Sequence, residues 1–497
     1  MTSSTVKTPR ASIADRLLRW SKNGWTVAAI LAIVTFALYA HTLTGFFIAD
    51  DAHFLWSAHR VLLPGLSPLE RLNALLGMSR ANQRIRVLGQ ASWVLDYALF
   101  ATSPAGYHLT NIIWQAIACV TTYLAIARLS KDRVLGALTA LVFAVYPVGA
   151  ETVTWLCVRL DSMCLTFLLL GLMAFVEWRT SHRLRWHAAA LAAWIMALAT
   201  KETAVMFLPM IVAYDLLLGG VYDRRLRTLC RRAVEYLPSL GLLLGYFLIR
   251  SRSVGVFGEH DTRSFVVRKL LTLPRALRNT GRTLLLPIND YYVDAVPPWV
   301  ALAIMIVLGL LAAKYLTRSD GKLLLFGTAW AILFMLPTGM SRVLDHLPLR
   351  FLYISAVGYA LFIATLVRAA LRNRRKAARW VLVLVILALL TIFVLGSIWN
   401  SLAWLESGRF LQRLAWAFVS QSQGYQGNQI IRIHDVDAVR YGVFYLDVPD
   451  VLQAVVETLY DADPSAFAPA PAGTAPPAEF HYRWDEAAGL LIPVPPR

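Results

Sequence analysis

Long, uncharged apolar runs recur along the chain and predict membrane-spanning helices. A helix needs about 20 mostly apolar residues to cross a bilayer. Six runs approach that length, and five shorter ones could also be buried or re-entrant helices. Together they predict about eleven spans, at residues 25–49, 109–127, 134–150, 162–176, 186–200, 203–214, 236–249, 295–313, 323–341, 351–367 and 380–398.

The distribution of Lys and Arg between these runs predicts the orientation of the chain. Cytosolic loops of membrane proteins carry an excess of Lys and Arg. The N-terminal tail, residues 1–24, is basic, and so is every second loop, at residues 128–133, 179–185, 224–232, 314–322 and 368–379. We therefore expect a multi-pass membrane protein with a cytosolic N-terminus and an external, periplasmic C-terminus.

The composition agrees with a membrane protein and explains the charge. The chain has 497 residues, of which 58% are hydrophobic and 16% charged, and its mean hydropathy is +0.55. Soluble proteins are nearer 45–50% apolar and about 25% charged. The net charge is +18, and by the predicted topology the cytosolic segments hold 25 basic and 7 acidic residues, whereas the outer segments hold 23 of each. The basic excess is therefore explained by the membrane topology. We expect the lipid bilayer as a partner and no nucleic acid.

Three external segments are long: the loops at residues 50–107 and 251–298, and the tail at residues 399–497. The tail predicts strands at 429–433 and 441–447, a short helix at 449–460, a Pro/Ala-rich linker at 463–478 and a hairpin at 480–484 and 490–494. The expected fold is an all-α polytopic membrane domain over residues 25–398, with interfacial helices in the first external loop and a small α/β external domain at the C-terminus.

The adjacent acids Asp50 and Asp51 directly follow the first apolar run. Carboxylates are costly near hydrocarbon. They could serve as a general base, as ligands of a divalent metal or as a proton relay, or they could be a solvated pair at the helix exit. No histidine cluster or CxxC pair predicts a zinc site, and no glycine-rich phosphate loop supports ATP-driven transport.

Further polar residues lie at the outer ends of the predicted spans. Guanidinium groups suit phosphate, and intramembrane charges either pair with each other or line a functional cavity. His108 and Asn111 could instead cap the second span. The candidates for binding a lipid-phosphate donor are Arg84, Arg86, His108, Asn111, Glu151, Arg159, Asp161, Lys201, Glu202, Arg268, Lys269, Arg350 and Tyr353.

The order and spacing of seven stretches over residues 25–370 resemble the GT-C superfamily of glycosyltransferases. The likeness is to protein O-mannosyltransferases, including the transmembrane and tetratricopeptide-repeat group, without the repeats. The stretches are FIADD at 47–51, RVL at 86–88 with LDYALF at 95–100, GYHLTN at 106–111, VFAVYP at 142–147 with Glu151, RLD at 159–161, LATKE at 198–202 and RFLY at 350–353. Val87 replaces the usual Pro, and Tyr146 the usual His.

This resemblance implies a function. The family transfers a sugar from a polyprenyl-phosphate donor to an acceptor hydroxyl on the outer face, with inversion, and its first acidic motif supplies the base. Carried over, Asp50 is the base, and Asp51 orients the acceptor or binds a metal. The acceptor could be a protein, a lipid or a glycan. The Ala- and Arg-rich usage and the missing repeats favour a bacterial inner membrane.

Two other classes of function remain open from the sequence. A lipid or glycan flippase could use Asp50, Glu151 and Lys201 as an intramembrane relay, although no pair of broken helices of the inverted-repeat kind is visible. A non-catalytic scaffold could present the external tail, in which case deletion of residues 399–497 would abolish function.

Overall fold

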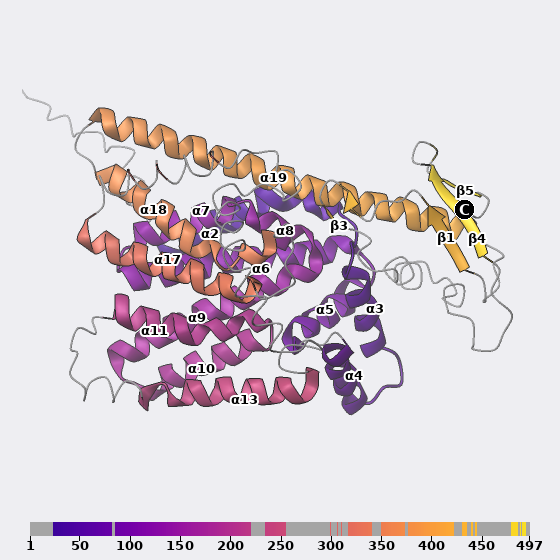
Figure 1. The fold of residues 1–497 in the computed structure, drawn as a ribbon, viewed down its shortest axis with the longest axis horizontal. Helices are drawn as coiled ribbons and strands as arrows, with labels where there is room; N and C mark the ends of the chain where they lie inside the picture. Colours follow the sequence, from indigo (N-terminus) through magenta and orange to yellow (C-terminus); the bar gives the residue numbers. More distant parts are fainter. Residues whose placement is uncertain are drawn as a thin grey trace, which may run out of the picture.

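The computed structural model describes residues 23–81, 85–219, 234–254, 299, 306, 310, 317–339, 349–372, 376–421, 430–434, 439–440, 443–444, 479–485, 488 and 490–493. This part of the chain is mostly helical (Figure 1). The helices form a bundle, along one side of which runs a single very long helix, α19 (Lys376–Gln421).

Four helices form the centre of the bundle: α6 (Pro104–Ser130), α7 (Arg133–Val145), α9 (Arg159–Ser181) and α10 (Leu184–Leu198). The main apolar core includes Leu165, Leu168, Leu169 and Leu172 of α9, each at most 2% exposed. Between Ser162 and Val176, α9 has no charged residue and lies inside the bundle, as expected of a helical segment without a charged face.

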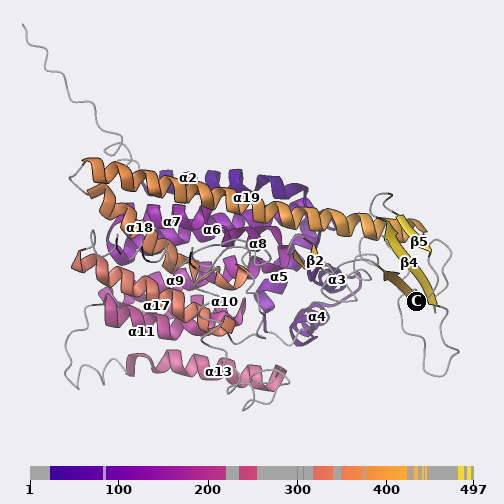
Figure 2. The same ribbon diagram turned by 45° about the horizontal axis from the view of Figure 1, so that its top comes forward.

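Other helices surround this centre. They are α2 (Gly24–Tyr39), α11 (Phe207–Leu217), α13 (Leu237–Val254), α17 (Arg318–Gly339) and α18 (Ala356–Arg372). Figure 2 shows α2 and α19 side by side, and α13 at the opposite edge. The first external loop folds into α3 (Asp51–Val61), α4 (Pro68–Ala81) and α5 (Val87–Phe100), at one end of the bundle.

Five helical segments are long and apolar enough to cross a membrane: Gly24–Thr44, Pro104–Ser130, Leu156–Ser181, Asp320–Pro337 and Val383–Ala417. A sixth candidate is α7 together with α8 (Val148–Thr154), which meet at 63°. The bend follows from Pro147, which lacks a backbone N–H and breaks the helical ladder. A multi-pass helical protein is therefore confirmed. The count of eleven spans stays a prediction, and the run at 295–313 lies almost wholly outside the described residues.

Two predicted spans have different ends in the structure. The first helix ends at Tyr39, continues as the 3-10 helix η1 (Ala40–Thr44), and is followed by residues that belong to no helix or strand up to the turn at Ala49. The last span does not end at residue 398, because α19 continues for 23 further residues without a proline to stop it. At 1.5 Å per residue its 46 residues span about 69 Å, more than twice a bilayer core of about 30 Å.

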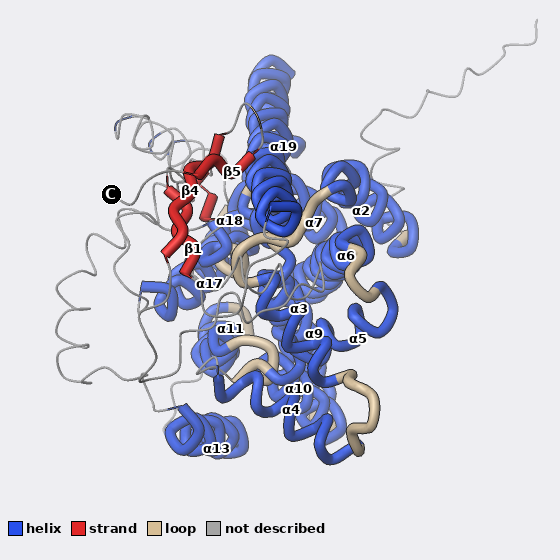
Figure 3. The backbone as a smooth tube through the Cα atoms, turned by 90° about the vertical axis from the view of Figure 1, so that its right-hand side faces the viewer, coloured by secondary structure: helices blue, strands red, loops and turns tan. Residues whose placement is uncertain are grey.

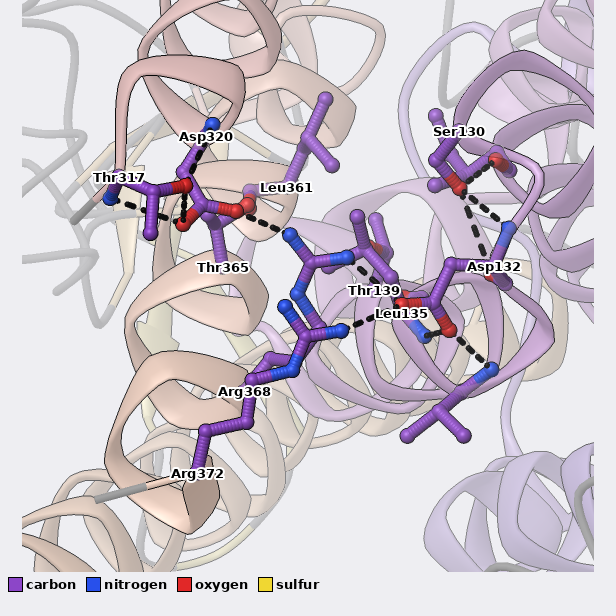
Figure 4. A network of polar contacts seen from close by, with 12 residues as sticks. Ser130, Asp132, Leu135, Thr139, Thr317, Asp320, Leu361, Thr365, Arg368 and Arg372 are labelled. Atoms are coloured by element: carbon purple, nitrogen blue, oxygen red, sulfur yellow. Dashed lines mark hydrogen bonds and ion pairs between the residues drawn. The ribbon is translucent and has the colours of Figure 1, made fainter. Parts of the chain in front are cut away.

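A network of ion pairs joins loops predicted to be cytosolic (Figure 4). Arg368 of α18 donates through Nη1 to Asp132, at 2.6 Å, and through Nη2 to Asp320. Asp132 in turn caps α7 by accepting from the N–H groups of Val134 and Leu135. Arg179 similarly pairs with Asp215 and Glu235. The basic loops at 128–133, 314–322 and 368–379 therefore share one end of the bundle, as the topology predicts. Which membrane side this is stays a prediction.

The described strands of the tail form two small sheets (Figure 3). In one, β1 (Ile430–His434) runs parallel to β4 (Glu479–Asp485), which pairs antiparallel with β5 (Leu490–Pro493). In the other, β2 (Val439–Arg440) pairs with β3 (Val443–Phe444). These confirm the strand at 429–433 and the hairpin, and only part of the strand at 441–447. The helix at 449–460 and the linker at 463–478 lie outside the described residues, and the α/β domain stays a prediction.

Candidate active site

The two carboxylates of the acidic motif have different environments. Residues 45–48 belong to no helix or strand, Ala49 and Asp50 form a turn in which Ala49 has a positive φ of 48°, and α3 starts at Asp51. A positive φ is costly for a residue other than glycine and is often found at functional sites. This turn sends the side chains of Asp50 and Asp51 in different directions: Asp50 is half-buried and Asp51 is fully buried.

Asp51 binds the backbone on both sides of the site. Its Oδ2 accepts from the N–H of Ile48, at 3.0 Å, and its Oδ1 accepts from the N–H of Cys157, at 2.7 Å. Burial, reinforced by the neighbouring Asp50 and opposed by these hydrogen bonds, raises the pKa of Asp51 to about 7. Asp51 therefore ties the acidic loop to a segment 106 residues further along the chain.

Asp50 has no such contacts. It is the N-cap residue of α3, but its side chain makes no capping hydrogen bond, and among the described residues it has no ion pair. Its carboxylate is therefore available to an incoming group at a partly open position. Of the two acids, Asp50 is the one whose contacts are compatible with a role as a base. Asp51 has a structural role, because it accepts hydrogen bonds from the backbone at Ile48 and Cys157.

The acidic loop contacts η2 (Leu156–Val158), a short 3-10 helix between α8 and α9. The thiol of Cys157 in η2 lies within electrostatic range of Asp50, Asp51, Arg86 and Arg350. Residues from three separated parts of the sequence thus converge on η2. The predicted clustering of Asp50, Arg86 and Arg350 at one end of the bundle agrees with this geometry.

Arg350 is the partly exposed cation of this cluster. Its Nη1 lies 2.8 Å from Oε1 of Glu151, and its backbone N–H donates to Oε2 of the same residue at 3.0 Å. The guanidinium lies over the ring of Trp155, 4.3 Å from the centroid, and Trp155 stacks on Trp404 of α19 at 5.0 Å. The side chain of Arg350 is 25% exposed. A planar cation held in this way can present its remaining N–H groups to an anion.

Arg159 and Asp96 form a second ion pair, which is buried. Nη1 of Arg159 donates to Oδ2 of Asp96, and Thr110 donates to Oδ1 at 3.0 Å. Arg159 also lies over the ring of Trp93, at 5.0 Å. With Arg159 fully buried, the pair joins α5, α6 and α9 and is not placed to contact a lipid phosphate directly.

Two further ion pairs join the loop after α10 to its neighbours. Lys201 lies 2.5 and 2.6 Å from the two carboxylate oxygens of Asp161. Arg86 binds Glu202 through two hydrogen bonds, of 2.7 and 3.0 Å. The first pair is almost fully buried, whereas Glu202 is one-third exposed. In the structure, the predicted donor-binding residues Lys201 and Arg86 are therefore each in an ion pair.

The polar residues of α6 do not cap it, because α6 begins at Pro104. Asn111 donates instead to the carbonyl groups of Thr152, Val153 and Leu156, at 3.1–3.4 Å, and so holds the C-terminal end of α8. His108 is fully buried beside Gly45, where a Cβ would lie 2.5 Å from its Nε2.

Tyr353 is fully buried and donates a hydrogen bond to Gln115. Arg84, Arg268 and Lys269 lie outside the described residues. His108, Asn111 and Tyr353 are therefore buried inside the bundle.

A metal does not fit the two acids well. Both oxygens of Asp51 are engaged by backbone N–H groups. Among the described residues no group of three or more His, Cys, Asp or Glu is arranged to hold a metal ion. The donor set therefore supports an acid–base role for Asp50 better than a two-carboxylate metal site.

The C-terminal part of α19 contributes residues that the sequence did not single out. Trp404 stacks on Trp155, and a Cβ on Gly408 would lie 3.2 Å from the side chain of Ile48. The close approach explains why glycine stands there. Trp404 and Gly408, which are four residues apart and therefore on the same side of a helix, were the available signal. The assignment of residues after 398 to a tail hid it.

Comparisons with known proteins give relatives of one kind. The human protein O-mannosyl-transferase TMTC3 is 26% identical over 224 residues, which are 43% of this chain and 24% of that protein. Tmtc1 of Drosophila melanogaster, also a protein O-mannosyl-transferase, is 30% identical over 266 residues, 51% of this chain and 29% of its own. The chain thus matches about a quarter of the length of these relatives. No family model matches it.

A solved structure is also similar. ArnT from Cupriavidus metallidurans, determined with bound undecaprenyl phosphate, aligns over 93% of this chain and 94% of its own, with 14% identity and a TM-score of 0.48. The sequence relatives confirm the resemblance expected from the ordered motifs: over about half of its length, this chain is similar to protein O-mannosyl-transferases.

Proposed function

We propose that the chain is an integral-membrane glycosyltransferase that moves a sugar from a polyprenyl-phosphate donor to an acceptor hydroxyl on the external face, with inversion. The observation that carries the proposal is the state of Asp50, a half-buried carboxylate without a partner among the described residues, at a junction with the partly exposed Arg350. The similarity to protein O-mannosyl-transferases supports the class of reaction.

Asp50 acts as the general base in this proposal. The acceptor hydroxyl gives its proton to the Asp50 carboxylate as its oxygen attacks the anomeric carbon of the donor sugar. The bond from that carbon to the phosphate oxygen breaks, and its electron pair leaves with the lipid phosphate. A single displacement of this kind inverts the anomeric centre and needs one carboxylate, as this site provides.

Arg350 stabilises the leaving phosphate. Glu151 engages Nη1, which leaves Nε and Nη2 to donate to phosphate oxygens. The stack on Trp155 holds the plane of the guanidinium before the donor binds, so that little reorganisation is needed as charge develops. Arg86, also close to η2, is the second cation assigned to the donor.

The buried pairs have a supporting role. Arg159–Asp96 and Lys201–Asp161 are almost inaccessible, and each cation already has a carboxylate. Removing one partner would leave an uncompensated buried charge, which is strongly destabilising. We propose that these four residues hold the helices around η2 together and do not contact the donor directly.

The same contacts weigh against a flippase. A charge relay across the membrane needs ionisable groups that can exchange partners along a path, yet Glu151 and Lys201 are each held in a local ion pair. The charges that converge on η2 lie at one end of the bundle, opposite the Arg368 network.

Label transfer separates these functions. The purified chain, reconstituted in nanodiscs, is given polyprenyl-phosphate mannose labelled in the sugar, together with peptides bearing Ser and Thr, a glycan or a lipid acceptor. The proposal predicts a covalent labelled product and release of polyprenyl phosphate. Movement of intact donor between leaflets of a liposome, with no product for any acceptor, would support the flippase instead.

A further inference from the structure

The most unusual feature of the site is the position of the second carboxylate of the acidic motif. Asp51 is completely buried, yet it accepts from backbone N–H groups of two segments that are not adjacent in sequence, at Ile48 and Cys157. Backbone donors cannot rotate away as side chains can. The two bonds therefore fix the distance between the acidic loop and η2.

The residue that gains from this fixed distance is Asp50. It is bonded directly to Asp51 in the chain, but within the described part of the chain its own side chain makes no hydrogen bond or ion pair that would fix its position. On its N-terminal side the loop lacks helical hydrogen bonds and contains the positive φ of Ala49. Without another restraint, the Asp50 carboxylate would be free to move relative to Arg350.

We propose that Asp51 is a positioning residue, whose carboxylate holds the acidic loop on η2. It thereby fixes the position of Asp50 relative to the phosphate-binding Arg350. This inference rests on the proposed function. It assigns Asp51 no contact with donor, acceptor or metal. Displacement of a reacting group by about 1 Å can cost a hundredfold in rate, so a bond that only fixes the loop can control turnover.

The bridge should depend on the protonation of Asp51. Its pKa is raised to about 7 by burial, and the ionisable groups that act on it are Asp50 beside it and the Cys157 thiol on η2. An ionised carboxylate accepts at both oxygens, whereas a protonated one carries a hydrogen on one oxygen and accepts well only at the other. Below about pH 7 one of the two backbone bonds weakens.

Asp51→Asn tests the inference, because the amide keeps the shape but has only one acceptor oxygen. The matched control is Asp132→Asn, whose carboxylate likewise accepts from two backbone N–H groups, at 3.0 and 3.1 Å, but at the opposite end of the bundle. We expect Asp51→Asn to lower kcat about a hundredfold with donor KM unchanged. We also expect kcat of the natural chain to fall from pH 8 to pH 6, and this fall to be absent in Asp51→Asn. Asp132→Asn should keep both kcat and the pH profile.

A role confined to stability would make Asp51→Asn behave like Asp132→Asn, with a lower melting temperature and a natural kcat per folded molecule; that result overturns the inference. Loss of activity in Asp50→Asn would then still support the proposed function. Retention of activity in Asp50→Asn would overturn the proposed function itself.

Hydrogen exchange on the natural chain gives a second test if Asp51→Asn does not fold. After correction for intrinsic exchange, amide protection should fall from pH 8 to pH 6 in a peptide containing Ile48 or in one containing Cys157, while protection in a peptide containing Val134 and Leu135 stays constant. The same pH dependence in all three peptides contradicts the bridge.

Discussion

The guanidinium of Arg350 lies over the ring of Trp155, 4.3 Å from its centroid, and both Arg350 and Asp50 act electrostatically on Cys157 of η2. This stack holds a cation that Glu151 neutralises only through one nitrogen and the backbone. In the proposed function, sugar transfer from a lipid phosphate needs a base for the acceptor, assigned to Asp50, and a preorganised cation for the leaving group, assigned to Arg350.

Arg350→Gln should weaken donor binding. A hydrogen bond to a charged group contributes about 1.5–3 kcal/mol, and about 1.4 kcal/mol corresponds to a tenfold change in an equilibrium constant. We therefore expect donor KM to rise about tenfold or more, measured by initial rates over a range of donor concentrations. Arg409→Gln, which removes an exposed arginine of α19, is the control and should leave KM unchanged. An unaltered KM in Arg350→Gln contradicts the assignment.

Trp404→Ala should impair both folding and turnover. Trp404 is 6% exposed and supports Trp155, which in turn supports Arg350. Truncating a buried Trp costs about 3–5 kcal/mol, so the melting temperature should fall, and kcat per folded molecule should fall as Arg350 loses its platform. Trp416→Ala, at a position 58% exposed on the same helix, should change neither. Equal effects of the two substitutions would show that α19 does not support the site beyond residue 398.

Arg368→Met should lower stability without changing the chemistry. It leaves Asp320, only 3% exposed, without its cation, and breaking a buried pair costs about 3–5 kcal/mol. Arg372→Gln removes an arginine that is 62% exposed and should cost no more than about 1 kcal/mol. Thermal melts in detergent measure both. Below the melting temperature both variants should keep natural donor KM, since the ion pairs drawn in Figure 4 join Arg368 and Arg372 to Asp132 and Asp320 and not to η2. A raised KM would place the network in the site.

Asp51 should also make stability depend on pH. Its pKa in the folded chain, about 7, lies above the ordinary 3.8, so between these values the folded state binds more protons than the unfolded state. Stability from this residue therefore falls as pH rises from about 4 to about 7. The difference in melting temperature between Asp51→Asn and the natural chain should move in favour of Asn as pH rises through this window. A constant difference would contradict the raised pKa.

The sequence predicted that the candidate residues lie at the outer ends of the spans, but not which side chains contact one another. The ordered motifs and the alternation of basic loops place Asp50, Arg86 and Arg350 at one end of the bundle. The division between Asp50 and Asp51 depends on the turn at Ala49, which no residue type marks, since alanine rarely has a positive φ. The pairing of Glu151 with Arg350, 199 residues apart, follows only from tertiary packing.

The extent of α19 was missed for a related reason. Hydropathy finds the segment that lies in lipid, and it stops where polar residues appear, at about residue 398. The helix itself continues because its backbone hydrogen bonds do not need an apolar face all round. Trp404 and Gly408 were thereby assigned to a tail, although they pack on the candidate site.

Transfer of label by Asp50→Asn tests the central claim most directly. The variant is compared with the natural chain and with Glu70→Gln, which changes an exposed acid in the same external loop. Each is reconstituted in nanodiscs with labelled polyprenyl-phosphate mannose and whichever acceptor the natural chain uses. If Asp50 is the base, Asp50→Asn folds, binds the donor and forms no detectable product, while Glu70→Gln transfers at the natural rate. Product formation by folded Asp50→Asn at the natural rate would contradict the account.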